Sequence, residues 1–178
     1  SICIKAFVEM EKDIERLTVV SERFSKIGSS VEIIETDLLE FFNNYISYMK
    51  KRIPKTIELN MEFINQPLHA SINAPLFSWV IENVIKNAAD AMEGNGNIYL
   101  NIDKQQNSIV IKVKDNGKGI PSSIQKQIFQ PGFTTKDRGW GLGLSLAKRI
   151  VEGHHNGKIY ISYSKKGVGT VVEITLPS

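Results

Sequence analysis

Two glycine-rich segments in the last third of the chain constrain its fold and function more than any other feature. The first reads Asp115-Asn116-Gly117-Lys118-Gly119-Ile120, and the second reads Gly139-Trp140-Gly141-Leu142-Gly143-Leu144-Ser145. Glycine lets a backbone turn sharply and pass close to a flat ligand. Either segment alone is typical of an ordinary tight turn, but the pair at this separation indicates a nucleotide held between them.

Composition sets the frame for this interpretation. The chain has 178 residues, of which 42% are hydrophobic and 23% charged, so it can bury one good core plus a modest appendage. Its net charge of +3 is small and its lysines are scattered, which argues against a nucleic-acid-binding surface. The single cysteine, Cys3, cannot form an internal disulfide and fits a reducing, cytoplasmic compartment.

The sequence reads as part of a longer protein. It begins at Ser1 without a methionine and enters a helical pattern at once. No run of apolar residues is long enough to span a membrane, so we expect any sensor or membrane anchor to lie outside this segment. The chain could then be the cytoplasmic part of a membrane-anchored protein.

Residues 1–28 predict a helix that needs a partner. Their apolar stripe steps alternately by three and four, the spacing of a coiled coil or helical bundle, through Phe7, Met10, Ile14, Leu17, Ser21 and Phe24. An amphipathic helix that folds onto its own domain fits the pattern equally well. Gly28-Ser29-Ser30 then ends the periodicity.

The remaining sequence predicts a mixed α+β domain over residues 29–178. Alternating or apolar runs predict strands over 31–34, 57–63, 98–102, 109–113, 159–163 and 169–176. Periodic segments predict helices from a cap at Asp37 to about Lys51, over 74–92, and over 143–154. We expect two layers, a largely antiparallel sheet with helices on one face.

Three polar side chains follow one face of the predicted helix over 74–92. Asn83 and Asn87 are four residues apart, and Asp90 continues the line. They could cap local backbone groups, which is the plain interpretation of half-buried amides. Alternatively, the two amide oxygens could bind Mg²⁺, which prefers oxygen ligands and is often shared with nucleotide phosphates.

Five segments in a fixed order resemble the ATP-binding domain of sensor histidine kinases. The segment over 82–92 resembles the asparagine box of that family, and DNGKGI from Asp115 resembles its first glycine box. The stretch over 128–136 resembles its phenylalanine box, GWGLGLSLAKRIV from Gly139 its second glycine box, and 167–170 its last glycine element. The wider superfamily includes gyrase, the heat-shock chaperone ATPase and the mismatch-repair ATPase. The resemblance implies a Bergerat-type ATP-binding fold, a two-layer α/β sandwich with a mixed, mostly antiparallel sheet.

The resemblance also implies a set of site residues, with ATP and Mg²⁺ as ligands. Asp115 would accept a hydrogen bond from the adenine amine and repel the carbonyl of guanine, and Lys136, in a short ATP lid over 134–140, could reach the γ-phosphate. The amides at Gly141 and Gly143 suit phosphate oxygens. The implied nucleotide-binding residues are Asn83, Asn87, Asp90, Asp115, Gly117, Gly119, Ile120, Thr135, Lys136, Gly141, Leu142, Gly143, Leu144 and Thr170, and Asn83 and Asn87 are the implied metal ligands.

The chain departs from the common family pattern at three places. Asp90-Ala91 stands where many of these kinases carry a basic and an aromatic residue, which puts phosphate contact from that helix in question. Gly132 replaces a usual phenylalanine, and Trp140 replaces a small hydroxyl residue. Both of these changes are expected to alter the packing of the lid.

The asparagine box favours phosphoryl transfer over hydrolysis. In the hydrolytic members of the superfamily a glutamate matches Asn83, but an amide cannot act as a base. Glu82 is adjacent in sequence, yet it points about 100° away around the helix. Transfer to a protein acceptor depends largely on positioning and charge stabilisation, which this chain retains.

Within the family, residues 1–28 would be the second helix of a dimerisation and histidine-phosphotransfer hairpin. The accepting histidine normally lies on the first helix, so no catalytic residue is expected in this chain, and His69, His154 and His155 are interpreted as structural or surface residues. The expected partners are the protein's own dimerisation domain in a homodimer and the receiver domain of a response regulator.

Two other functions remain open at this stage. An anti-sigma-factor kinase, which phosphorylates serine, shares the nucleotide fold but would not be expected to carry the periodic leader. A purely structural nucleotide-binding module is the second alternative, and the complete glycine set argues against it.

Overall fold

The computed structural model describes residues 31–64, 67–136 and 139–178, together with residues 7, 8, 10, 11, 14, 18, 21 and 25. It divides into two compact units, Ser1–Glu32 and Ile33–Ser178. The described residues up to position 25 are helical, and four positions of the predicted stripe are exposed, namely Phe7, Met10, Ile14 and Ser21. Leu17, Phe24 and the Gly28-Ser29-Ser30 break lie outside the described residues.

A five-stranded mixed sheet forms one layer of the second unit. Its strand order is β2-β4-β5-β7-β6, with bounds Ile57–Phe63, Gly96–Gln105, Ser108–Asp115, Gly169–Pro177 and Lys158–Lys165 in that order. Only the β2 and β4 pair is parallel within this sheet, while the β4–β5, β5–β7 and β7–β6 pairs are antiparallel. The predicted mixed, mostly antiparallel sheet is therefore confirmed.

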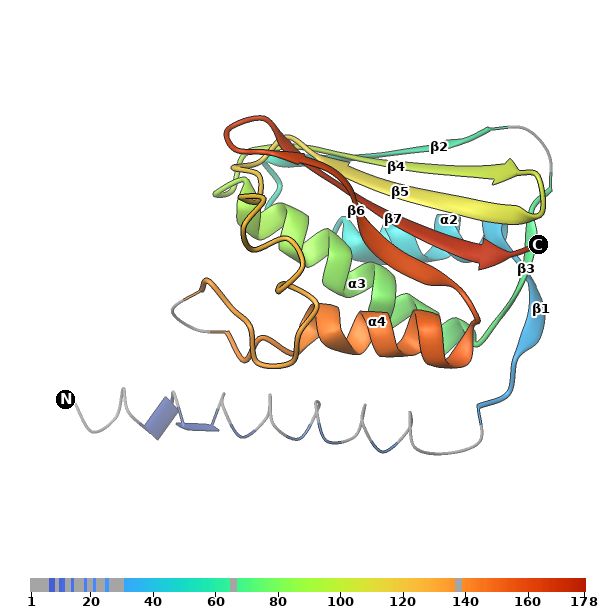
Figure 1. The fold of residues 1–178 in the computed structure, drawn as a ribbon, viewed down its shortest axis with the longest axis horizontal. Coiled ribbons are helices and arrows are strands. Elements are labelled where there is room, and N and C mark those ends of the chain that lie inside the picture. Colours follow the sequence, from blue (N-terminus) through green and yellow to red (C-terminus); the bar gives the residue numbers. More distant parts are fainter. Residues whose placement is uncertain are drawn as a thin grey trace. The chain divides into compact units, whose positions relative to one another are not determined.

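Three helices form the second layer, on one face of that sheet (Figure 1). They are α2 (Leu38–Met49), α3 (Ala74–Ala91) and α4 (Gly143–His154). Asp37 caps α2 by accepting hydrogen bonds from the backbone of Leu39 and Glu40, as predicted. Asn73 caps α3, whose first turn also holds Pro75, where the missing N–H costs nothing.

A small sheet that the sequence did not predict stands beside these layers. It pairs β1 (Ile34–Asp37) with β3 (His69–Ile72) in antiparallel register. The strand expected over 31–34 thus begins three residues later, because its hydrogen bonds depend on a partner in β3 rather than on its own composition.

Among the described residues, no helix has the length and apolar character needed to cross a bilayer.

His155 ties the start of α3 to the end of α4. Its ring is buried, with Nε2 accepting a hydrogen bond from the Asn73 N–H at 3.0 Å and Nδ1 lying 2.9 Å from the Ile150 carbonyl oxygen. The Phe77 ring packs 5.6 Å from it. Only the neutral ring with its proton on Nδ1 satisfies both contacts, and burial lowers the pKa of His155 below its ordinary value of 6.5.

We expect the stability of the domain to fall when the pH drops below about 6.5. Above that pH the His155 ring is neutral in both the folded and the unfolded chain. Below it, the unfolded chain binds a proton, while the ring in the folded chain stays neutral until the pH reaches its lowered pKa. Each pH unit between the unfolded pKa and the lowered folded pKa then costs about 1.4 kcal/mol. Urea unfolding at pH 7.5 and 5.5 measures the loss. His155→Gln should remove this loss of stability, whereas replacement of the exposed His69 by glutamine should leave it in place. Equal losses of stability in the two variants would contradict the pH-sensitive role of His155.

Candidate functional site

Asp115 lies at the end of β5, where the central strand of the sheet delivers it beneath the first glycine-rich segment. Its side chain is only 6% exposed, and Oδ1 accepts a hydrogen bond of 2.8 Å from the Gly117 N–H. Burial raises the pKa of the Asp115 carboxyl above its ordinary 3.8, while hydrogen bonds from the Gly117 and Thr170 backbones oppose that shift. A buried acceptor held in this way suits a ligand that donates a hydrogen bond.

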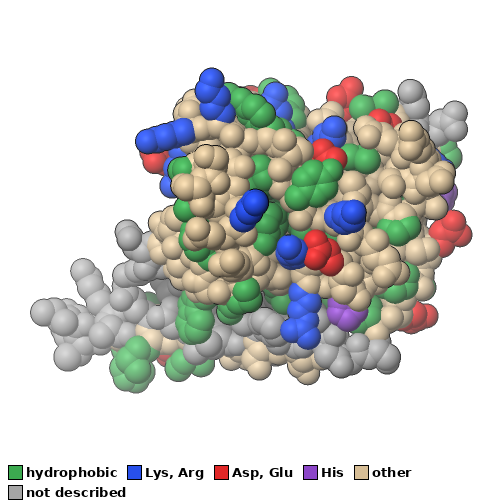
Figure 2. Space-filling model, viewed as in Figure 1, with side chains coloured by type: hydrophobic (Ala, Val, Ile, Leu, Met, Phe, Trp, Pro, Cys, Tyr) green, Lys and Arg blue, Asp and Glu red, His purple; other side chains and the backbone are tan. Residues whose placement is uncertain are grey.

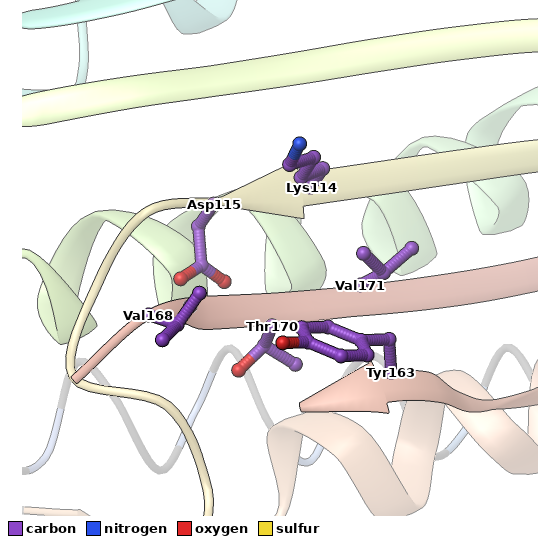
Figure 3. A pocket seen from close by; sticks show the side chains of 7 residues that line it. Lys114, Asp115, Tyr163, Val168, Thr170 and Val171 are labelled. Carbon is purple, nitrogen blue, oxygen red and sulfur yellow. The ribbon is translucent and has the colours of Figure 1, made fainter. Parts of the chain in front are cut away.

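A pocket of about 380 Å³ reaches Asp115 between the ends of β5, β6 and β7. Its lining comprises Lys114, Asp115, Tyr163, Val168, Gly169, Thr170 and Val171. In Figure 3 the Asp115 carboxylate points toward Val168 and Thr170, while Lys114 points away from them on the other side of the strand. Asp115 and Thr170, both predicted from the sequence, therefore lie together, and they are directly paired in the sheet register.

The first glycine-rich loop is held between α3 and the β6–β7 hairpin. A Cβ at Gly117 would lie 2.7 Å from the Ala91 carbonyl oxygen, and one at Gly119, where φ is +70°, would overlap the Lys165 carbonyl. Ile120 donates its N–H to Ser164 Oγ at 2.8 Å, and Ser164 Oγ lies 2.9 Å from Thr170 Oγ1. Sequence reasoning missed Ser164, because nothing in the local pattern distinguishes it from other serines on a strand.

Asn83 of α3 lies against the start of α4. Asn83 donates its Nδ2 hydrogen to the Trp79 carbonyl oxygen at 2.9 Å, which leaves its Oδ1 directed away from the helix backbone. A Cβ at Gly143 would lie 2.8 Å from that Oδ1, so only glycine fits there without displacing the amide. Asn87 follows one turn later, and both asparagines are partly buried.

Helix α4 begins at Gly143, within the second glycine-rich segment. No side chain caps its first turn in the described structure, and Leu142, at the cap position, accepts the Leu146 N–H through its carbonyl oxygen. Leu142, Gly143 and Leu144 are partly buried beside α3. Free amides at a helix start bind phosphate oxygens well, as expected for the second glycine-rich segment.

A backbone hydrogen bond between two glycines joins the residues on either side of the lid. Gly132 donates its N–H to the Gly141 carbonyl oxygen at 3.0 Å, and a Cβ at Gly141, where φ is +63°, would collide with Phe133. Gly132 itself has a φ of +81°, so its replacement of the family's usual phenylalanine permits a left-handed turn. Trp140 is exposed, while residues 137 and 138 lie outside the described residues.

Lys136 contacts α3 from the lid. Its Nζ lies 2.9 Å from Asn87 Oδ1 and 2.5 Å from Asp90 Oδ2. Thr135, its neighbour, is exposed, and the Lys136 N–H bonds to Thr134 Oγ1 at 3.1 Å. The site therefore gathers the asparagine box, both glycine segments and the lid around one region.

Replacing Gly143 by alanine is expected to weaken binding of ATP by roughly tenfold, the value of about one good hydrogen bond. The new methyl group would displace the Asn83 amide oxygen that lies 2.8 Å from its position. Gly153→Ala is a matched control in the same helix, because its Cβ would meet nothing within 4 Å. The control should leave affinity unchanged and stabilise the domain by about 1 kcal/mol. Calorimetry giving both variants wild-type affinity would contradict the packing argument.

Comparison with known proteins identifies the type of site. A family model described as histidine kinase-, DNA gyrase B-, and HSP90-like ATPase matches residues 73–178, which contain α3, both glycine segments and the lid. The chain belongs to this family. Members of this ATPase family bind ATP, so this domain binds ATP.

The similar proteins are sensor kinases. Sporulation kinase E of Bacillus subtilis is 30% identical, over 86% of this chain and 23% of the length of that kinase. The catalytic domain of histidine kinase ThkA matches with a TM-score of 0.74 at 30% identity, covering 83% of this chain and 96% of that domain. A structure of ThkA in complex with the response regulator protein TrrA covers 94% of this chain and 48% of the matched one, with a TM-score of 0.77 at 25% identity.

These comparisons confirm the predicted family and the α+β catalytic-domain fold. The chain holds the catalytic ATPase domain of a two-component sensor histidine kinase, a transferase. It spans 23% of the length of sporulation kinase E, so the activity of a whole sensor kinase involves more chain than is present here.

Proposed function

We propose that this domain transfers the γ-phosphate of Mg-ATP to a histidine on the dimerisation domain of its own protein. The observation that carries the proposal is the gathering of Asp115, the α3 asparagines and the start of α4 around one region, with the amide Asn83 in place of a base. In the transfer, the bond between the β,γ-bridging oxygen and the γ-phosphorus breaks, a phosphorus–nitrogen bond forms to the imidazole, and ADP leaves.

Each part of the site has a separate role in this proposal. The Asp115 carboxylate accepts a hydrogen bond from the adenine amine, with Thr170 beside it, and Gly117, Gly119 and Ile120 form the loop against the base. The α4 amides from Gly141 to Leu144 bind phosphate oxygens, and Thr135 and Lys136 cover the nucleotide from the lid. Because these groups are held by the fold before ATP arrives, little reorganisation accompanies transfer.

The two asparagines fit Mg²⁺. Asn83 directs its oxygen away from the helix because its nitrogen is hydrogen-bonded to Trp79, and Asn87 Oδ1 already accepts the positively charged Lys136 ammonium. No cluster of three or more histidine, cysteine or acidic side chains suited to a metal occurs among the described residues. When bound, Mg²⁺ would neutralise phosphate charge, and amide oxygens are suitable ligands because the phosphates themselves supply the negative charge.

Poor hydrolysis belongs to the same proposal. Glu82, the nearest carboxylate in sequence to Asn83, is buried and pairs with Lys86 Nζ at 2.5 Å along the helix. Because Glu82 forms this ion pair with Lys86, we expect that it does not activate water beside the γ-phosphate. ATP bound at this site would then persist until an acceptor histidine arrives.

The domain organisation and partners complete the proposal. Residues 1–28 would be the second helix of the dimerisation hairpin and residues 29–178 the catalytic domain, working in a cytoplasmic homodimer. Exposed apolar residues on the N-terminal helix support an interacting partner there. The ThkA structure with a response regulator supports a receiver domain as the next partner.

On the face seen in Figure 2, lysines and arginines are interspersed with acidic and neutral side chains, unlike a nucleic-acid-binding patch.

Calorimetry with ATP, ADP and GTP, with and without Mg²⁺, tests the binding part of the proposal. We expect ATP and ADP to bind with a Mg²⁺ dependence that Asn87→Ala largely removes, and GTP to bind more weakly. Equal affinities for ATP and GTP would overturn the assignment of Asp115. Unchanged Mg²⁺ dependence in Asn87→Ala would place the metal elsewhere.

A further inference from the structure

Lys136 occupies an unexpected position for a lysine expected to meet the γ-phosphate. Its Nζ contacts two groups on neighbouring turns of α3, Asn87 Oδ1 at 2.9 Å and Asp90 Oδ2 at 2.5 Å. The Lys136 N–H also bonds to Thr134 Oγ1, so the backbone that carries the side chain is itself in a local turn. The lid is therefore joined to α3 through one ammonium group.

This contact conflicts with metal binding at the same oxygen. Asn87 Oδ1 is the oxygen proposed for Mg²⁺, which binds its ligands at about 2.1 Å. An ammonium hydrogen-bonded to that oxygen would stand within a few ångströms of the ion, and two cations so close repel each other. Lys136 and Mg²⁺ are therefore alternatives at Asn87, and one must leave when the other binds.

We propose that Lys136 is a built-in competitor of Mg²⁺ at Asn87, and that Asp90 is the positioning residue that holds it there until a nucleotide arrives. This inference rests on the proposed function. It assigns Asp90, which replaces the basic residue common in related kinases, a role through Lys136 rather than direct contact with phosphate.

We call the contact of Lys136 Nζ with Asn87 and Asp90 the latch, and it is weak enough to open reversibly. Lys136 and Asp90 are 44% and 55% exposed, and ion pairs as exposed as this one are weak. The latch should therefore reduce affinity for nucleotide only about two- to fivefold. The latch must open for either nucleotide at the same cost, but only ATP then offers the displaced lysine a γ-phosphate, whereas ADP offers it no such partner.

The affinities of Mg-ADP and Mg-ATP for two variants separate the roles of the two residues. Asp90→Asn weakens the latch but keeps the lysine, so both affinities should rise by the same factor, about two- to fivefold. Lys136→Gln removes both the latch and the γ-phosphate contact, so Mg-ADP should bind more tightly while the preference for ATP over ADP falls by about five- to tenfold. Asp90→Glu should restore wild-type behaviour, because it keeps the charge.

Glu152→Gln is the matched control. It breaks a comparably exposed ion pair with Lys148 on α4, whose partners are 43% and 41% exposed, and it should change neither affinity. A second readout needs no ligand: the NMR resonances of the Asn87 side-chain amide in the nucleotide-free protein should shift in Asp90→Asn and in Lys136→Gln, and stay in place in Glu152→Gln.

Three outcomes would overturn this inference. Unchanged affinities in Asp90→Asn would mean that the latch has no effect, and a loss of both affinities would make Asp90 a direct ligand. Unshifted Asn87 resonances in Lys136→Gln would mean that the lysine is elsewhere in solution. A wild-type protein that binds neither nucleotide would instead overturn the proposed function, which keeps the two failures distinct.

Discussion

Replacing Asp115 by asparagine is expected to weaken ATP binding by about ten- to a hundredfold, because a charge-assisted hydrogen bond is worth about 1.5–3 kcal/mol. The adenine amine would lose the only buried carboxylate that the described structure places at the end of β5. Asparagine also offers a donor, so it can meet the carbonyl of guanine. Discrimination between ATP and GTP should therefore decrease in the same variant, as measured by calorimetry.

The same substitution should not destabilise the nucleotide-free domain. Burial raises the pKa of the Asp115 carboxyl, so at neutral pH the folded state carries a charge that is more costly there than in the unfolded chain. The wild type should thus gain stability relative to Asp115→Asn as the pH falls through that raised pKa toward 3.8. Asparagine can still accept the Gly117 N–H but gives up an acceptor for the Thr170 backbone, which offsets part of the gain from removing the charge, so its unfolding midpoint at pH 7.5 should stay close to that of the wild type.

Asp103→Asn provides the control, since Asp103 lies on β4 and its Oδ1 accepts a local hydrogen bond from the Lys104 N–H. It should change neither nucleotide affinity nor ATP selectivity. Full ATP affinity and undiminished selectivity in Asp115→Asn would remove Asp115 from the base pocket. Lost affinity with a lowered unfolding midpoint would indicate damage to the fold rather than to recognition.

The sequence predicted the long helices and strands well because the residue pattern that specifies each of them lies within its own segment. The bounds of α3 and α4 follow from apolar periodicity, and α3 also begins at a local cap, Asn73 followed by Pro75. Strand β2 was predicted at its observed bounds from strict alternation. Strand β3 has four residues and pairs with β1 more than thirty residues earlier in the chain, so its local sequence did not predict it, and the strand expected over 31–34 was displaced by three residues. Nor does alternation reveal that β2 runs parallel to β4, since strand direction depends on how the chain crosses between them.

The sequence proposes which residues form the site, but it could not predict the contacts that their side chains make. Family motifs placed Asn83, Asn87 and Asp115 in one site, because a motif carries spacing from proteins of the same fold. The contact of Lys136 with α3 joins side chains 46 and 49 residues apart. It depends on a side-chain conformation that no pattern encodes. The bond from Ile120 to Ser164 spans 44 residues and was missed for the same reason.

We expect this chain, incubated with labelled ATP, to leave itself unlabelled and to phosphorylate a separately supplied dimerisation segment that carries an acceptor histidine. The chain has three histidines, and none lies in residues 1–28. His155 is buried between α3 and α4, where its two ring nitrogens already contact Asn73 and Ile150. We expect the asparagine at position 83 to spare the bound ATP from hydrolysis, so that the γ-phosphate remains available to an acceptor in solution.

The rate in trans should rise with the concentration of the supplied segment, because a covalent tether normally provides an effective concentration of about the millimolar range. The label should be lost in acid and kept in base, as phosphohistidine requires, and a segment with glutamine in place of the acceptor should stay unlabelled. Asp115→Asn should slow the reaction at low ATP and recover at high ATP, since its defect lies in binding. Label on His69, His154 or His155 would contradict their structural interpretation, and acid-stable label on a partner serine would favour an anti-sigma-factor kinase.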